Sequence, residues 1–215
     1  AARSLDRRAI MAGALDGGAP VIAWLADPVD AYFLHVQGSG RLAMPDGRTI
    51  RVGYAGRNAH DYVSIGRLLV ERGVFAPGTL TADLLADWLR ADTGRGARLM
   101  AENPSYIFFE RRGTLSPSDG PVGAAGVPLT AMRSIAVDPG HHPLGRAYWL
   151  EAEIPGPGGE GTETFRGLVV AEDTGSAIRG PGRVDLFTGS GAAAGLRAGR
   201  VQTRGRLWPI LPREA

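Results

Sequence analysis

The sequence of 215 residues contains no cysteine. Disulfide bonds, a thiolate nucleophile and cysteine metal sites are therefore excluded. No apolar run has the length of a membrane helix, and basic residues form no run, so we expect neither a transmembrane segment nor a nucleic-acid partner. The histidines show no metal-ligand spacing, and the pair His141 and His142 is typical of a loop, so we expect no metal ion and no cofactor.

Glycine and proline are abundant, with 32 and 15 copies, while 44% of the residues are hydrophobic and 21% are charged. This composition favours a globular protein with many short strands joined by tight turns, and the length suits one large or two small domains. We predict a mainly β fold with a few helices. The expected helices cover residues 3–15, 63–71, 81–90 and 96–101, and the expected strands cover 20–25, 31–36, 49–54, 105–110, 135–137, 147–153, 167–171, 184–187 and 200–210.

Two aspartates flank a glycine-rich turn in the C-terminal half of the chain. Asp173 follows a short apolar run that ends at Ala171, and Asp185 lies within a second strand-like run, Val184 to Phe187. Both carboxylates therefore lie near strand ends. Spacing alone leaves open that they only cap turns, because aspartate before glycine commonly does so.

The tripeptide Asp173-Thr-Gly175 is also the active-site signature of aspartic peptidases. In that class two aspartates share one proton. Only one such tripeptide occurs here, so a peptidase would need a homodimer, and the charged Glu172 occupies a position where an apolar strand residue is expected. The short motif therefore carries little weight.

Longer stretches resemble the membrane-bound lytic transglycosylase A family and its 3D domain, which is named for three aspartates. Asp173 to Gly180 and Arg183 to Phe187 match the signature, and Asp138 is the third aspartate. Further segments similar to the family are residues 30–40, 53–62, 103–109 and 205–208. The resemblance thus covers nearly the whole chain.

The resemblance implies a double-psi β-barrel catalytic domain and a second β-barrel-like domain, with the substrate groove between them. We place the β-rich domain with helices at residues 1–101 and the catalytic domain at residues 102–215. The family also has an N-terminal segment that helps build the catalytic domain, and we expect that segment to lie outside this chain. The implied location is the periplasm, with association of the full-length protein with the outer membrane left open, and we expect a monomer.

The implied substrate is the peptidoglycan strand, cleaved between N-acetylmuramic acid and N-acetylglucosamine. A general acid must protonate the leaving oxygen, which requires a carboxyl group with a raised pKa. In the resembled enzymes one aspartate acts as acid and then as base while the muramyl C6 hydroxyl attacks, which gives a 1,6-anhydro ring. This role maps onto Asp185, with Asp173 in support and Asp138 as the remaining candidate catalytic residue.

Candidate glycan contacts lie in the matching segments and in the turn between the aspartates. Each residue also has a purely structural explanation, as a turn, cap or core residue or as a solvated arginine. A glycan-binding module without turnover remains an alternative function. The candidate substrate-binding residues are Gln37, Ser39, Tyr54, Asn58, His60, Arg179 and Arg183.

Overall fold

The computed structural model describes residues 2–113 and 119–211, which form two compact units. The first unit extends to Leu115 and the second begins at Ser116. The predicted boundary near residues 101–103 lies earlier in the chain, whereas strand β3 (Ile107–Arg111) pairs with β2 of the first unit.

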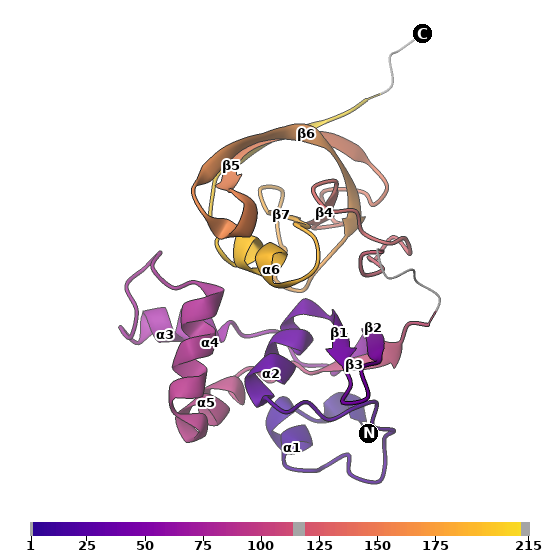
Figure 1. Cartoon of the computed structure of the whole chain (residues 1–215), viewed down its shortest axis with the longest axis vertical. Coiled ribbons are helices and arrows are strands. Elements are labelled where there is room, and N and C mark those ends of the chain that lie inside the picture. The colour runs from indigo at the N-terminus through magenta and orange to yellow at the C-terminus, as the bar shows by residue number, and fades with distance from the viewer. Residues whose placement is uncertain (1, 114–118, 212–215) are drawn as a thin grey trace. The chain divides into compact units, whose positions relative to one another are not determined.

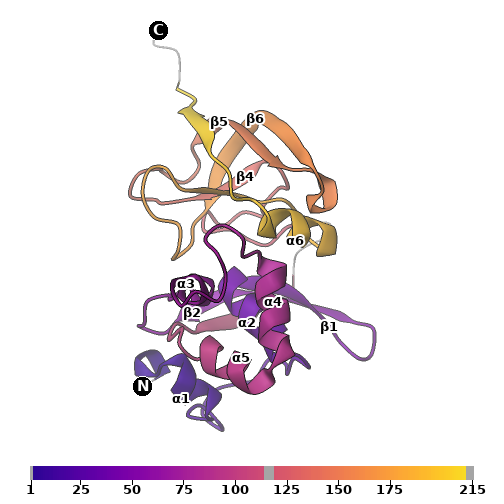
Figure 2. The same cartoon turned by 90° about the vertical axis from the view of Figure 1, so that its left-hand side faces the viewer.

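The first unit combines a three-stranded antiparallel sheet, in the order β1-β2-β3, with short helices. In Figures 1 and 2, α4 lies beside α5. Apolar residues of α2, α3, α4 and α5 form its core, and Trp88 packs against that core. The elements are η1 (Ala2–Ser4), α1 (Arg7–Met11), α2 (Pro28–Gln37), β1 (Ser39–Ala43), β2 (Thr49–Arg57), α3 (Ile65–Glu71), α4 (Ala82–Ala91), α5 (Thr93–Met100) and β3.

The strand predicted over residues 31–36 is wrong, because this segment belongs to helix α2. The Asp27 side chain accepts a hydrogen bond from the backbone N–H of Val29 at 2.8 Å, and Pro28 occupies the first turn. Gly38 ends the helix with a left-handed φ of 76°. The cap, the proline and the terminal glycine together outweigh the β preference of the apolar residues between them.

Other elements of the first unit are shorter than predicted or are not formed. The helix expected over residues 3–15 is shorter, because α1 begins after its N-cap residue Asp6 and ends at Met11. Residues 20–25 form no strand. Among its described residues the first unit contains the three-stranded sheet rather than a barrel-like arrangement.

The second unit contains a five-stranded sheet in the order β7-β4-β6-β5-β8. Figure 1 shows β5 and β6 as long curved strands that form an arc around β4 and β7. Helix α6 was not predicted, since its glycines and the missing side-chain cap obscure the helical pattern. The elements are β4 (Ser134–Val137), β5 (Ala147–Pro155), η2 (Pro157–Gly159), β6 (Thr162–Asp173), β7 (Val184–Leu186), α6 (Ala192–Gly199) and β8 (Gly205–Pro209).

The core of the second unit lies on one face of this sheet. Ile135, Val137, Val169 and Ala171 are all fully buried, with Tyr148 beside them. The mainly β prediction with a few helices is confirmed for the chain. No helix in the described residues is both long and apolar enough to cross a bilayer.

Candidate active site

Strand pairing brings Asp173 and Asp185 to the same level of the second unit's sheet. On β4, Ala136 lies opposite Asp173 of the parallel strand β6 and opposite Asp185 of the antiparallel strand β7. Directly opposed residues project from the same face of a sheet. Two steps of about 4.8 Å between neighbouring strands put the two backbones roughly 10 Å apart.

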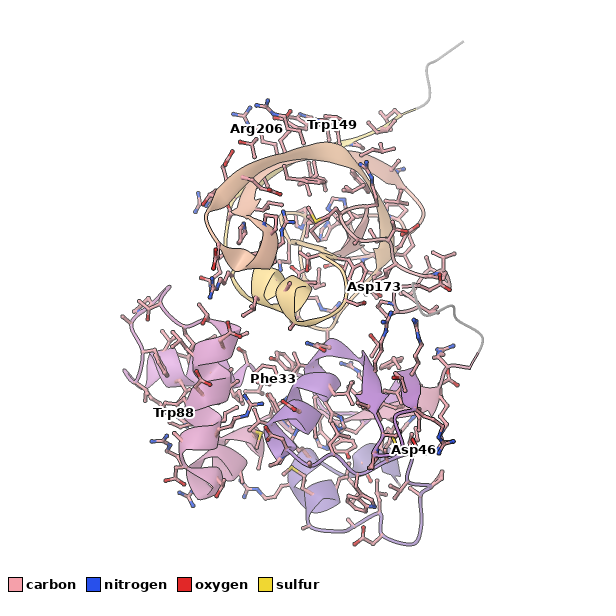
Figure 3. The ribbon with its side chains drawn as sticks, in the orientation of Figure 1. Phe33, Asp46, Trp88, Trp149, Asp173 and Arg206 are labelled. Atoms are coloured by element: carbon pink, nitrogen blue, oxygen red, sulfur yellow. The ribbon has the colours of Figure 1, made fainter. Side chains whose placement is uncertain are left out.

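Asp173 is partly buried at the end of β6. Its Oδ1 accepts a hydrogen bond from the backbone N–H of Ala124 at 3.0 Å. Burial raises the pKa of this carboxyl, and backbone hydrogen bonds from Thr174 and Ala124 partly offset that rise. Figure 3 shows Asp173 well away from Trp149 and Arg206, which project from the convex side of the arc.

Asp185 is the more accessible of the two carboxylates, with 46% of its side chain exposed. Arg183, two residues earlier on the same strand edge, makes a bidentate contact with it. The distances are 2.6 Å from Nε to Oδ1 and 3.1 Å from the terminal guanidinium nitrogen to Oδ2. Arg183 therefore lies beside the predicted acid, as well as being a candidate for the substrate's carboxylate.

Asp138 holds the turn rather than facing a substrate with free oxygens. Its Oδ2 accepts the N–H of Gly180 at 2.7 Å, and its Oδ1 accepts the N–H of Gly140 at 3.0 Å. These bonds to Gly180 and Gly140 lower the pKa of Asp138, so the group stays ionised and is poorly suited to donate a proton. In this structure Asp138 anchors the turn through both carboxylate oxygens, and its catalytic role stays a prediction.

The turn between the two site aspartates has further anchors. His142 contacts the carbonyl of Pro181 at 2.9 Å through Nε2 and the hydroxyl of Tyr148 at 3.2 Å through Nδ1. Arg179 donates from Nε to the carbonyl of Ser176 at 3.2 Å and is exposed. The connection between β6 and β7 is therefore tied to the sheet at several points.

Asn58 is a structural residue of the first unit, and the prediction that it contacts glycan is corrected. Its side chain is 1% exposed. The amide nitrogen donates to the carbonyls of Leu5 and Pro104, each at 2.8 Å, and the amide oxygen accepts the N–H of Tyr106 at 2.9 Å. With both ends of the amide engaged in the interior, no polar atom remains for a sugar.

The other candidates of the first unit lie nearer to solvent. Gln37 is exposed at the end of α2, and Ser39 opens β1, where it lies opposite Gly53. Tyr54, the next residue of β2, is 50% exposed. Gln37 ends the helix two residues before Ser39, and Tyr54 follows the partner of Ser39 on β2, while His60 contacts the carbonyl of Ser4 at 3.1 Å.

Two residues near Asp173 were not predicted from the sequence: Glu172, which precedes it on β6, and Ser134 of β4, which contacts Glu172. The Ser134 hydroxyl donates to the Glu172 carboxylate. A charged residue at the end of an apolar strand was the available signal for Glu172. Nothing in the sequence singles out Ser134, because its importance depends on which strands pair.

Two family models match the chain. The MltA specific insert domain matches residues 2–110, and the 3D domain matches residues 133–211. The membrane-bound lytic murein transglycosylase A of Vibrio cholerae is 36% identical over 209 residues, which is 95% of this chain and 55% of that protein. The chain therefore spans little more than half the length of the curated relatives it matches.

Solved structures agree with these matches. A membrane-bound lytic murein transglycosylase from Agrobacterium tumefaciens has a TM-score of 0.87 and 40% identity, with 98% of this chain and 57% of that one covered. MltA from E. coli with bound chitohexaose has a TM-score of 0.84 and 32% identity, with 97% of this chain and 61% of that one covered.

Proposed function

Because the chain belongs to the membrane-bound lytic murein transglycosylase A family, we propose that it contributes the acid–base site of an enzyme that cleaves peptidoglycan. The bond is the β-1,4 linkage between N-acetylmuramic acid and N-acetylglucosamine, and the product carries a 1,6-anhydromuramyl end. The observation that carries this proposal is the placement of Asp173 and Asp185 opposite the same residue, Ala136, on either side of β4.

Asp185 is the proposed acid and base. Its exposure allows contact with a polysaccharide, and the pairing of β7 with β4 places it opposite Ala136. The carboxyl group first protonates the glycosidic oxygen as positive charge develops at the anomeric carbon. The resulting carboxylate then accepts the proton of the muramyl C6 hydroxyl as that oxygen attacks, so one group serves both steps.

Arg183 must leave Asp185 before that carboxyl group can reach the glycosidic oxygen, because the guanidinium engages both of its oxygens. The lactyl carboxylate of muramic acid, or the peptide attached to it, offers Arg183 another acceptor. Asp173 supports the reaction from the other side of β4. Burial raises its pKa, and its Oδ1 accepts the N–H of Ala124, which holds the carboxyl group in place.

Gln37, Ser39, Tyr54, His60 and Arg179 remain proposed glycan contacts. The relative solved with bound chitohexaose supports an oligosaccharide ligand for the family fold. The relatives' description as membrane-bound supports a location in the cell envelope, and we propose the periplasm. We also propose that the curved sheet of the second unit forms part of a double-psi β-barrel.

Mass spectrometry of purified peptidoglycan tests this function. The protein is expected to release muropeptides lighter by one water than hydrolytic products, and Asp185→Asn is expected to release none. Asp46→Asn is the matched control, because Asp46 is an exposed aspartate of the first unit, labelled in Figure 3, that pairs with Arg48 two residues away. This control should retain full activity.

Two results would overturn the assignment. Anhydro products from Asp185→Asn at the normal rate would remove Asp185 from the chemistry. Glycan binding by the unaltered protein without any anhydro product would instead favour a binding module.

A further inference from the structure

Strand β6 carries one more residue than β4 at the point where Asp173 lies. Ile135 of β4 pairs with Ala171, but the next residue of β4, Ala136, pairs with Asp173. Glu172 and Asp173 therefore both lie opposite Ala136. This is the arrangement of a β-bulge, in which an inserted residue redirects the side chains that follow.

The extra residue decides which face Asp173 occupies. Side chains alternate along a strand, so a regular ladder would put Glu172 opposite Ala136. Asp173 would then point to the same side as Ala171 and Ile135, both of which are fully buried in the core. With the bulge, Asp173 instead shares the face of Ala136 and Asp185.

A buried hydrogen bond lies directly at the bulge. Ser134 is 0% exposed, and its hydroxyl donates to the Glu172 carboxylate while accepting the backbone N–H of Thr130 at 2.7 Å. Hydrogen bonds to an ionised acceptor are stronger than neutral ones. The side chain of the inserted residue is thereby fixed to the strand that the bulge faces.

The loop at residues 123–126 closes the other side of the bulge. The Ala125 N–H donates to the carbonyl of Glu172 at 2.9 Å, and the Ala124 N–H donates to Asp173. A Cβ at Gly123 would lie 2.4 Å from the carbonyl oxygen of Glu172, so only glycine permits this approach. The loop thus binds the backbone of one bulge residue and the side chain of the other.

We infer that Glu172, held by Ser134, is a positioning residue that fixes the β6 bulge and so keeps Asp173 on the same face as Asp185. The inference rests on the proposed function for its catalytic meaning, but the bulge itself can be tested without turnover. Glu172 acts through Asp173 and touches no substrate. This role explains a charged residue in a strand whose preceding residues are apolar.

The test compares Glu172→Ala with Glu172→Gln, which keeps an oxygen to accept the Ser134 hydroxyl. We expect kcat on peptidoglycan to fall about 10- to 100-fold in Glu172→Ala, because small displacements of a catalytic group cost that much, with little change in KM. Glu172→Gln should retain most of the activity. In the same variants, NMR should show the pKa of Asp173 and the Ala124 amide signal changed by alanine and preserved by glutamine.

The outcomes separate the alternatives. Equal loss of kcat in both variants would assign Glu172 a role through its charge or proton and overturn the positioning role, as would normal kcat and an unchanged Asp173 pKa in Glu172→Ala. If Glu172→Ala fails to fold, Ser134→Ala breaks the same bond from β4 and the same criteria apply. If the unaltered protein makes no anhydro product, the proposed function fails, while the NMR comparison still decides whether Glu172 holds the bulge.

Discussion

The two units differ in how many polar side chains they bury. The first unit buries Arg7, Asn58 and Asn103, whereas the second unit buries Ser134 beside a largely aliphatic cluster and leaves Asp185 accessible. In the first unit the polar atoms are used to hold backbone segments together. The difference shows that burial and hydrogen-bond satisfaction, rather than residue type, separate structural polar residues from candidates for chemistry.

Arg7 is the clearest example of the buried arrangement. It is 3% exposed and donates to the carbonyls of Asn103 at 3.0 Å and Ser105 at 2.6 Å. Its guanidinium also lies 4.9 Å from the ring centre of Tyr32 and 5.3 Å from that of Tyr106. Burial lowers the pKa of Arg7, and burial together with the nearby Arg7 charge lowers the pKa of His35 to about 3.

The largest effect on stability is expected from Arg7→Met. The change leaves two buried carbonyls without their donors and removes the cation from between the tyrosine rings, so the free energy of unfolding should fall by about 3 kcal/mol or more. Urea denaturation measures this change. Arg8→Met is the matched control because Arg8 is exposed, and it should change stability by less than about 0.5 kcal/mol. Equal effects of the two substitutions would contradict the structural role of Arg7.

A smaller loss of stability is expected for Asn58→Ala, and it should still exceed the loss for His60→Ala. Asn58→Ala removes three hydrogen bonds to the backbone and should cost about 2 kcal/mol in urea denaturation. His60→Ala, at a partly exposed site with a contact to Ser4, should cost less than about 0.5 kcal/mol. If Asn58→Ala keeps its stability but loses glycan binding, then Asn58 is a contact residue after all.

The smallest expected effects are on the pH dependence of stability, and they have opposite signs for Asp138 and Asp173 of the second unit. The pKa of Asp138 is lowered in the folded state, so its stabilisation is present above the ordinary value of 3.8 and is lost as the pH falls through the folded value. The destabilisation by Asp138→Asn should therefore be greatest near neutral pH and vanish in acid.

Asp173 has the opposite linkage, because its pKa is raised by burial. Its ionised form costs stability above the raised value, and this cost disappears as the pH falls toward 3.8. Asp173→Asn should thus unfold at an equal or higher temperature than the unaltered protein at neutral pH. Thermal unfolding from about pH 3 to about pH 7 distinguishes the two aspartates, and parallel profiles would refute the assignment.

Much of the second unit was predictable because its signals are local. The apolar runs that became β4, β6 and β7 are short and bounded by turns; Asp173 ends β6, and Asp185 lies within β7. The bulge at Glu172 was not predictable, since it exists only relative to the pairing of β6 with β4. For the same reason no local pattern indicated Ser134.

In the first unit, the local sequence patterns did not predict the folded structure as well. The cap at Asp27 and the terminal Gly38 were present in the sequence, but the apolar residues between them were interpreted by their β preference. Asn58 lies in a segment that also resembles the family signature, and only the fold reveals that its amide is buried. The burial of Asn58 depends on segments distant in the sequence, residues 5 and 104–106. A local stretch of sequence therefore cannot predict it.

The two site aspartates also differ in how firmly their strands are held. Asp173 ends β6, which pairs on both sides, whereas Asp185 lies on the three-residue strand β7 at the edge of the described sheet. Such an edge opens at a lower free energy than a central strand does. Asp185 can therefore fluctuate while Asp173 stays fixed, and amide hydrogen exchange in the site is set by β7 rather than by the core.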